Sequence, residues 1–409
     1  MPQTVDLAEL GRILERLPSD PRIVISGNAA TPQSIIDLID TSVPRVTLHL
    51  LNAIADMPAR PGVTLETAFV GPGMRRKPNL RYIPCRLSMV PLLLQRDLRP
   101  DVVIVHTSTP RDQVVSLGIE VNILPAAIES ARANGALVVA AVNPQMPFTL
   151  GDSQVRLTDV DYLVEVDDPL VTTAGGSDDP IAAQIGELIS THVEHGATLQ
   201  LGIGAVPDAV LAALVDSREL RIWSEVIGDG VLELENAGVL DRDQPVGTSF
   251  ILGSADLYQW ADCNHRVRMV RTEVCNDPSV IAKNPAMTSV NGALEVDLHG
   301  QANASRVNGQ IYSGIGGSTD FIIGAMHSPG GQSFMAMPSW HPKANKSTVV
   351  PALVGPVTSF QQTAVVTEQG IAWLFGASEQ EQAQRLIDHA AHPQAREDLR
   401  EAAAAMMLP

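Results

Sequence analysis

A carboxylate, two amide side chains and a glycine-rich run lie close together in one stretch of the sequence. Glu273 precedes a predicted turn at 276–278, Gln301 and Asn303 follow, and the run Ser313–Gly317 closes the stretch. A carboxylate can act as a nucleophile on a carbonyl carbon. Glycine N–H groups can approach the oxyanion that forms there, because no Cβ blocks them. The stretch therefore predicts covalent chemistry on a carbonyl compound.

The same residues also have structural interpretations. A single carboxylate before a turn often caps the N–H groups of that turn, and spacing alone favours this role for Glu273 over that of a nucleophile. Amides that enter a loop either hold a substrate or order the loop, and we weigh the two roles equally for Gln301 and Asn303. Glu295 and Asp297 alternate with apolar residues, which predicts structural positions on the polar face of a strand.

The surrounding sequence predicts a scaffold of parallel α/β sheets. We expect strands at 22–26, 101–106, 136–142, 198–201, 222–226 and 248–253, and helices at 33–39 and 126–134. Strands that alternate with helices are typical of a parallel sheet, whose sites lie at the carboxyl ends of the strands.

Two stretches share a strand–loop–helix pattern, which indicates a faint internal duplication. Gly27 follows the first strand, and Pro32 comes five positions later, before a helix. Gly202 and Pro207 repeat this spacing in the second stretch. The polar, Gly/Pro-rich segment 167–180 lies between them and is interpreted as a linker. The sequence thus predicts two tandem α/β domains.

Four motifs occur in one order along the second half of the chain. They read E-V-C-N-D-P from Glu273, N-G-A-L-E-V-D-L-H-G-Q-A-N from Asn291, S-G-I-G-G-S-T-D-F from Ser313 and V-V-T-E-Q-G-I-A-W-L from Val365. In this order they resemble the acetyl-CoA hydrolase/transferase family, the class I CoA-transferases that include 4-hydroxybutyrate and acetate enzymes. The resemblance implies two tandem CoA-transferase-like α/β domains, 1–175 and 176–409, with the active site in the cleft between them.

The resemblance also implies roles for individual residues. It makes Glu273, in the second domain, the nucleophile. It places coenzyme A against Thr248, Ser249, Phe250, Ile251 and Leu252. We also assign Gly316 and Gly317 to this site as candidate oxyanion donors, and Lys343 because it can supply the charge of the arginine that segment 338–351 lacks. The resemblance places Glu368 near the pocket, and we assign Gln301 and Asn303 to the substrate from their position in the loop. Coenzyme A then enters as a co-substrate, and no tightly bound cofactor is expected.

The implied reaction moves CoA between an acyl-CoA and a carboxylic acid through a glutamyl-CoA thioester. Water as the acceptor would instead make an acyl-CoA hydrolase, and the sequence does not separate the two because water exclusion depends on pocket closure. A less favoured alternative is a non-catalytic ligand-sensing module. Its support is the segment 338–351, where Ala344 replaces an expected glycine and Ser347-Thr348 replaces a Ser-Arg pair.

Composition excludes several other classes of function. The net charge of −18 argues against nucleic acid as a partner, because phosphates need a basic face. The three cysteines fit neither metal-ligand spacing nor a disulfide framework, and the histidines form no metal motif. Gly202-Ile203-Gly204 lacks the third glycine of a dinucleotide fingerprint. The amino terminus lacks signal-peptide features and no apolar run is long enough to span a membrane, so we predict a cytoplasmic protein. We also expect a homodimer that acts on a small-molecule acyl-CoA and a carboxylic acid.

Overall fold

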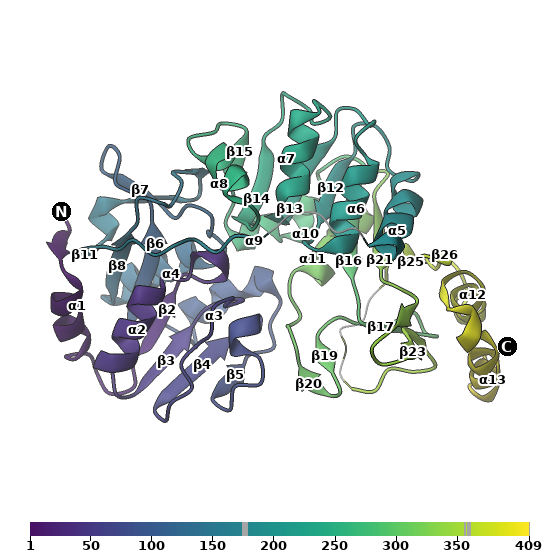
Figure 1. Cartoon of the computed structure of the whole chain (residues 1–409), viewed down its shortest axis with the longest axis horizontal. Coiled ribbons are helices and arrows are strands. Elements are labelled where there is room, and N and C mark those ends of the chain that lie inside the picture. Colours follow the sequence, from purple (N-terminus) through teal and green to yellow (C-terminus); the bar gives the residue numbers. More distant parts are fainter. Residues whose placement is uncertain (174–178, 356, 358–360, 409) are drawn as a thin grey trace. The chain divides into compact units, whose positions relative to one another are not determined.

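The chain forms two compact units, and each unit combines separate segments of the sequence (Figure 1). The computed structural model describes residues 1–173, 179–355, 357 and 361–408. Unit 1 contains residues 1–173, 246–275 and 311–316, and unit 2 contains the described parts of 174–245, 276–310 and 317–409. Residues 174–178 of the predicted linker at 167–180 lie outside the described residues.

Among the described residues, unit 1 is built around an eight-stranded parallel sheet. The strand order is β1-β11-β8-β6-β2-β3-β4-β5. The bounds are β1 Gln3–Val5, β2 Arg22–Ile25, β3 Val46–His49, β4 Val63–Thr67, β5 Leu80–Tyr82, β6 Val102–Thr107, β8 Leu137–Val142 and β11 Tyr162–Glu165. The order reverses between β2 and β6. The carboxyl ends of strands at such a reversal are the usual ligand site of an open α/β sheet.

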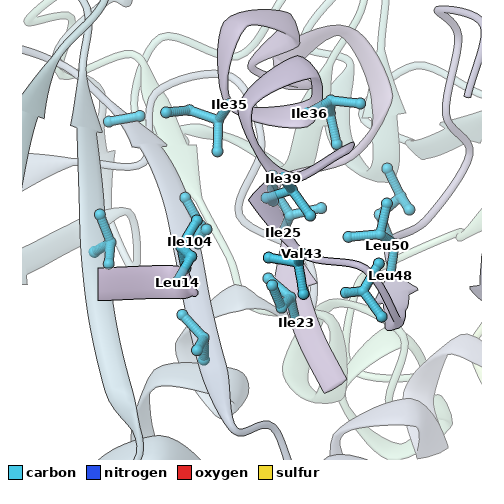
Figure 2. Packing of buried hydrophobic residues seen from close by; sticks show 14 of the residues in the cluster. Leu14, Ile23, Ile25, Ile35, Ile36, Ile39, Val43, Leu48, Leu50 and Ile104 are labelled. Carbon is cyan, nitrogen blue, oxygen red and sulfur yellow. The ribbon is translucent and has the colours of Figure 1, made fainter. Parts of the chain in front are cut away.

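Helices with apolar faces cover this sheet. They are α1 Leu7–Leu14, α2 Gln33–Ser42, α3 Val90–Gln95 and α4 Leu124–Asn134. α4 ends at Gly135, whose φ of 69° is left-handed and suits glycine. Figure 2 shows Ile36 and Ile39 of α2 beside Ile25 of β2 in a buried apolar cluster. Burial of such side chains stabilises the unit by roughly 1.5–3 kcal/mol each.

The later segments of the sequence add a second group of elements to unit 1. The parallel run β14-β15-β9 consists of β14 Val246–Ile251, β15 Val267–Met269 and β9 Leu150–Gly151. Helices α8 Ala255–Ala261 and α9 Thr272–Cys275 belong to the same part. β7 Val114–Ser116 and β10 Gln154–Arg156 form an antiparallel pair.

Unit 2 contains strands in the order β26-β25-β21-β16-β12-β13, in which only the β25–β26 pairing is antiparallel among the described pairs. Their bounds are β12 Thr198–Leu201, β13 Arg221–Ile227, β16 Thr288–Gly292, β21 Gln332–Ala336, β25 Ala364–Thr367 and β26 Gly370–Trp373. The helices are α5 Pro180–Ser190, α6 Ala205–Ala213, α7 Asp229–Asn236, α10 Pro278–Ile281, α11 Ser318–His327, α12 Glu379–Arg385 and α13 Arg396–Ala405. Short strands are β17 Glu295–Asp297, β18 Ala302–Asn303, β19 Arg306–Val307, β20 Gln310–Ile311, β22 Trp340–His341, β23 Lys346–Ser347 and β24 Val349–Val350.

The predicted strands and helices are confirmed, with shifted ends. The largest shift is in α2, which continues to Ser42 rather than ending at Ile39. The two similar stretches start their helices differently, because Pro32 precedes α2 whereas Pro207 lies inside the first turn of α6. Mixed α/β architecture with parallel sheets is therefore the fold class, as the sequence predicts.

The predicted domain boundaries, 1–175 and 176–409, remain a prediction. The compact units divide the chain differently, because residues 246–275 and 311–316 pack with the amino-terminal part. Glu273 is therefore in unit 1. No helix of the described residues is both long and apolar enough to cross a bilayer.

Unit 1 buries a charged cluster around Glu66. Nε of Arg22 donates to its carboxylate at 2.9 Å, Nδ1 of His49 lies 3.0 Å from the same oxygen, and Nη1 of Arg81 lies 3.3 Å from the other. The side chain of Glu66 is fully buried. Burial alone would raise its pKa, but the hydrogen bonds from His49 and Arg22 outweigh burial and hold the pKa at about 2.

Replacing this carboxylate should destabilise the fold in a pH-dependent way. Glu66→Gln should lower the free energy of unfolding by about 3 kcal/mol at neutral pH, since the pKa falls from 4.5 to about 2 on folding. This contribution is complete above pH 4.5 and is lost as the pH falls toward 2, so the deficit should shrink in acid. Urea denaturation at pH 7 and pH 3 measures it, with the exposed Glu165→Gln as control. An equal deficit at both pH values would contradict this account.

Candidate active site

Glu273 lies in a short helix of unit 1 that is tied to the end of a strand. The helix α9 starts at Thr272, whose N–H donates to the carbonyl of Asn122 at 3.0 Å. The N–H of Asn122 donates in turn to the carbonyl of Ser249 in β14 at 3.3 Å. Backbone hydrogen bonds therefore connect Glu273 to the segment 248–252, which the family resemblance places against coenzyme A.

The carboxylate of Glu273 is held by Arg271. Nε of Arg271 donates to Oε1 of Glu273, and its two Nη groups donate to Glu129 at 2.7 and 2.8 Å. Oε2 of Glu273 is buried and has no hydrogen-bond partner among the described residues. Burial raises the pKa of Glu273, although the charge of Arg271 opposes the shift. Glu273 is thus an ion-paired carboxylate with one oxygen engaged.

The turn after Glu273 is capped by another residue. The carboxylate of Asp277 accepts the N–H of Ser279 at 2.7 Å, at the amino terminus of α10. The capping role that spacing suggested for Glu273 therefore belongs to Asp277.

A buried polar network joins the loops after β2 and β3 to the loop before α4 in unit 1, and sequence reasoning did not find it. Glu120, which is almost fully buried, accepts hydrogen bonds from the side-chain amides of Asn28 at 2.6 Å and Asn122 at 3.1 Å. The amide of Asn52 donates to Asn28 at 2.7 Å. All three asparagines have left-handed φ angles, of 48°, 46° and 34° for residues 28, 52 and 122. Asparagine adopts left-handed φ angles more readily than most residues, but the conformation is still uncommon. Three such residues in one network therefore indicate a functional or architectural constraint.

The predicted CoA-binding segment in β14 satisfies its hydroxyl groups internally. The hydroxyl of Thr248 donates to the carbonyl of Phe250 at 2.9 Å, and that of Ser249 donates to the carbonyl of Val270 at 2.7 Å. The whole segment from Thr248 to Leu252 is buried. Gly316, with a φ of 65°, joins the same unit, and its carbonyl accepts the N–H of Leu87 at 3.2 Å. Three parts of the predicted site therefore lie in unit 1: Glu273, the segment 248–252 and Gly316.

Unit 2 holds a second carboxylate, which sequence reasoning missed. Glu225 in β13 is mostly buried, and its Oε2 accepts a hydrogen bond from Nδ2 of Asn276 at 2.7 Å. A Cβ on Gly317 would lie 2.0 Å from the same oxygen, so only glycine allows this approach. Burial, reinforced by the charge of Asp320 and opposed by the hydrogen bond from Asn276, raises the pKa of Glu225 to about 7.

This arrangement can perform chemistry on a carbonyl. A carboxylate with a pKa near neutrality and few water contacts is a candidate nucleophile or base. Gly317 caps α11, and the first N–H groups of a helix lack intrahelical partners. Such N–H groups can stabilise negative charge that develops beside Glu225. The sequence did contain a signal, since Glu225 is a carboxylate inside the strand predicted at 222–226.

The remaining predicted residues lie in unit 2, and three of them have structural partners among the described residues. Nε2 of Gln301 donates to the carbonyl of His299 at 3.4 Å. Asn303 accepts the N–H groups of Ser305 and Arg306, so it orders its own loop. Glu368 accepts hydrogen bonds from the N–H and hydroxyl of Ser339. Burial would raise the pKa of Glu368, but these hydrogen bonds lower it.

Lysines near the altered segment differ in their surroundings. Lys343 is exposed in the turn between β22 and β23. Lys346 pairs with Glu295 at 2.6 Å, so its charge is already neutralised. Among the described residues, no group of three or more His, Cys, Asp and Glu side chains is arranged to hold a metal ion.

Comparison with known proteins identifies the class to which the fold and site belong. Residues 7–174 match the acetyl-CoA hydrolase/transferase N-terminal domain, and residues 253–403 match the C-terminal domain of the same family. The 4-hydroxybutyrate coenzyme A transferase of Clostridium kluyveri is 38% identical over 330 residues, which cover 78% of this chain and 76% of the relative. The chain therefore belongs to the acetyl-CoA hydrolase/transferase family. Its members are CoA-transferases and acetyl-CoA hydrolases, so the prediction of an enzyme is confirmed.

Solved structures agree with this assignment. RipA from Yersinia pestis is 26% identical and superposes with a TM-score of 0.92, covering all of this chain and 98% of RipA. The 4-hydroxybutyrate CoA-transferase from Porphyromonas gingivalis is 31% identical with a TM-score of 0.83, covering 99% of this chain and 98% of that enzyme. The two tandem family domains and the α/β fold are thus shared with CoA-transferases.

A side chain at residue 317 should disrupt the site around Glu225. Gly317→Ala would place a Cβ 2.0 Å from Oε2 of Glu225 and 2.2 Å from Nδ2 of Asn276, so the carboxylate or the start of α11 must move. We expect kcat for acyl-CoA turnover to fall roughly 10²–10³-fold, the usual cost of a displaced oxyanion donor. Gly292→Ala is the matched control, because a Cβ there meets only the carbonyl of Ala336 at 3.9 Å. Unchanged kcat in Gly317→Ala would contradict the assignment of this site.

Proposed function

We propose that the chain is a CoA-transferase that moves CoA between an acyl-CoA and a carboxylic acid. Membership of the acetyl-CoA hydrolase/transferase family supports an acyl-CoA substrate. The observation that carries the proposal is the carboxylate of Glu225, which is mostly buried, bonded to Asn276 and in contact with the backbone of Gly317. Such a carboxylate can form and release an acyl bond without help from a metal or a bound cofactor.

Four balanced steps complete the reaction. The carboxylate attacks the thioester carbonyl, the C–S bond breaks, and CoA leaves as a thiolate with an acyl-glutamyl anhydride behind it. The thiolate attacks the glutamyl carbonyl of this anhydride, and the first acid departs as a carboxylate to leave a glutamyl-CoA thioester. The acceptor carboxylate then displaces the thiolate to give a second anhydride. The thiolate finally attacks the acceptor's acyl carbon, and the free glutamate is restored.

Two carboxylates compete for the covalent step. Glu273, predicted from the sequence, is engaged by Arg271, and a guanidinium that stabilises the anion makes it a weaker nucleophile. Glu225 is bonded by the neutral amide of Asn276 and has its pKa raised to about 7 by burial, so its anion is less stabilised. We therefore propose Glu225 as the nucleophile and retain Glu273 as the alternative. In the proposed mechanism Asn276 orients the carboxylate, and Gly317 leaves room for it.

The hydrolase is the second candidate function. Water could attack the same glutamyl-CoA thioester, and the family contains acetyl-CoA hydrolases. The choice depends on whether water reaches that thioester during turnover.

Several finer expectations accompany the proposal. Coenzyme A is a co-substrate rather than a resident cofactor, and the acceptor is a small carboxylic acid. Residues 248–252, Gly316, Gly317 and Lys343 are proposed to contact CoA, and Gln301, Asn303 and Glu368 to lie toward the substrate. A cytoplasmic homodimer remains a prediction.

Trapping the covalent intermediate identifies the nucleophile. Incubation with an acyl-CoA and no acceptor, followed by borohydride reduction of the glutamyl thioester and peptide mass spectrometry, should modify the peptide that contains Glu225. Glu225→Gln should lose the adduct and lose at least 10⁴-fold in turnover, a cost typical of removing a covalent nucleophile. Glu273→Gln is the matched comparison and should still form the adduct. Modification of the Glu273 peptide instead would assign the covalent step to Glu273.

The pH dependence of thioester cleavage should report the ionisation of Glu225. The nucleophile must be deprotonated, so the burst in which the first carboxylic acid is released should weaken as the pH falls below about 7. Asp320→Asn removes a negative charge that raises the pKa of Glu225. The acid limb of the pH profile, in which the burst weakens as the pH falls, should therefore move to lower pH in this variant. Stopped-flow measurement of the burst between pH 5 and 9 tests both statements. A limb that stays in place in Asp320→Asn would show that Asp320 does not influence the nucleophile.

Product analysis separates the two candidate functions. With acyl-CoA and acetate present together, a transferase should form acetyl-CoA, and free CoA thiol should stay low. A hydrolase should release free CoA at the same rate with or without acetate. Mass spectrometry of the thioesters and a thiol assay distinguish these outcomes.

A further inference from the structure

Asn291, near the carboxyl end of β16, carries an amide that is oriented by a buried neighbour. Its Nδ2 donates to Oε1 of Gln200 in β12 at 3.1 Å, and Gln200 is 5% exposed. Oδ1 of Asn291 has no hydrogen-bond partner among the described residues. Asn291 itself is partly exposed, so a ligand can reach the acceptor that remains.

The strand register places Asn291 and Glu225 on the same face of the unit 2 sheet. Leu199 in β12 pairs with Ile222 in β13 on one side and with Thr288 in β16 on the other. Glu225 and Asn291 each lie three residues beyond those partners. Because side chains alternate between the two faces of a strand, these two side chains point to one face at the same level. Two strand spacings of about 4.8 Å separate their backbones, which therefore lie roughly 10 Å apart.

Gly202 occupies the matching position on the chain between them. It is the third residue after Leu199 and directly follows the last residue of β12. Among the described residues, a Cβ added at Gly202 would meet only Cγ of Pro207 within 4 Å, at 3.9 Å. The middle strand therefore places no side chain between Glu225 and Asn291. A linear ligand that extends from one to the other crosses glycine backbone.

An acyl-CoA carries a suitable donor at this distance. Its cysteamine N–H lies four bonds from the thioester carbonyl carbon, roughly 5 Å away when the chain is extended. A reacting carboxylate approaches that carbon to about 3 Å, and an N–H···O bond adds about 2.9 Å at the other end. These lengths together match the roughly 10 Å between the two strands. Oδ1 of Asn291 can only accept a hydrogen bond, so it favours an N–H over the carboxylate of an acid.

We propose that Asn291, held by Gln200, accepts a hydrogen bond from the cysteamine N–H of the acyl-CoA and so places the thioester carbonyl at Glu225. Asn291 then determines specificity for the thiol part of the substrate, and Gln200 is a positioning residue that acts through Asn291. This assignment rests on the proposed function, because it takes Glu225 as the group that attacks the thioester.

Two small thioesters isolate this hydrogen bond. S-Butyryl-N-acetylcysteamine keeps the N–H, whereas the butyryl thioester of 2-acetoxyethanethiol has an oxygen in its place. The initial rate of butyrate release with excess acetate gives kcat/KM for each substrate. The full-length protein should prefer the N–H thioester at least threefold, because the oxygen analogue turns an acceptor toward Oδ1 of Asn291. A smaller preference overturns the proposal.

Three variants locate the source of the preference. Asn291→Leu removes the acceptor and should bring the ratio of the two kcat/KM values to about one, through loss of rate with the N–H thioester. Gln200→Leu should also lower the ratio, because Asn291 loses the group that orients its amide. Asn236→Leu is the matched control, since Asn236 is an exposed asparagine of α7 in the same unit, and it should keep the wild-type ratio.

The outcomes separate this assignment from the covalent chemistry. An unchanged ratio in Asn291→Leu, or an equal loss of rate with both thioesters, overturns the role of Asn291 even where trapping finds the adduct on Glu225. An adduct on Glu273 instead rejects the proposed function, whatever the ratio in Asn291→Leu. Full preference in a folded Gln200→Leu variant removes the positioning role. Asn291 is partly exposed, so its variant still tests the proposal if Gln200→Leu does not fold.

Discussion

The contact between the carboxylate of Glu225 and the backbone of Gly317 is the constraint on which the proposed site depends. A methyl group at residue 317 would overlap the carboxylate oxygen, so the absence of a Cβ decides whether the start of α11 can approach the strand β13. The approach removes water from the carboxylate and raises its pKa, and it brings helix N–H groups toward the place where an oxyanion would form. Reactivity and oxyanion stabilisation therefore have one geometric cause.

Unit 1 also buries a carboxylate, Glu120, but asparagine side chains satisfy it with hydrogen bonds. Three asparagines adopt left-handed conformations in unit 1, after β2, after β3 and just before α4, and two of them donate to the buried Glu120. These hydrogen bonds satisfy a buried carboxylate and fix the loops from which Asn122 holds α9. Arg271 then joins Glu273 to Glu129. This part of unit 1 is better suited to holding fixed charges and loops in position than to supplying a free nucleophile.

Several residues that the sequence assigned to the active site form hydrogen bonds with other groups of the chain in the structure. The hydroxyls of Thr248 and Ser249 donate to backbone carbonyls, and Asn303 orders its loop. The carboxylate of Glu368 accepts a hydrogen bond from the N–H of Ser339.

The sequence by itself determined the fold class, the presence of the predicted strands and helices, and the family. Apolar strands such as 101–106 and helices such as 126–134 follow from local periodicity and end signals, which depend on near neighbours in the chain. Four motifs that occur in one order along the sequence indicated the family. The environment of a carboxylate does not follow from local pattern, because it depends on distant segments. Glu273 has Arg271 nearby in the sequence. The environment of Glu225 is instead set by Asn276, Gly317 and Asp320, which come 51 or more positions later. Burial and the charge of Asp320 raise the pKa of Glu225, and the hydrogen bond from Asn276 opposes that shift. Only tertiary structure brings these residues together.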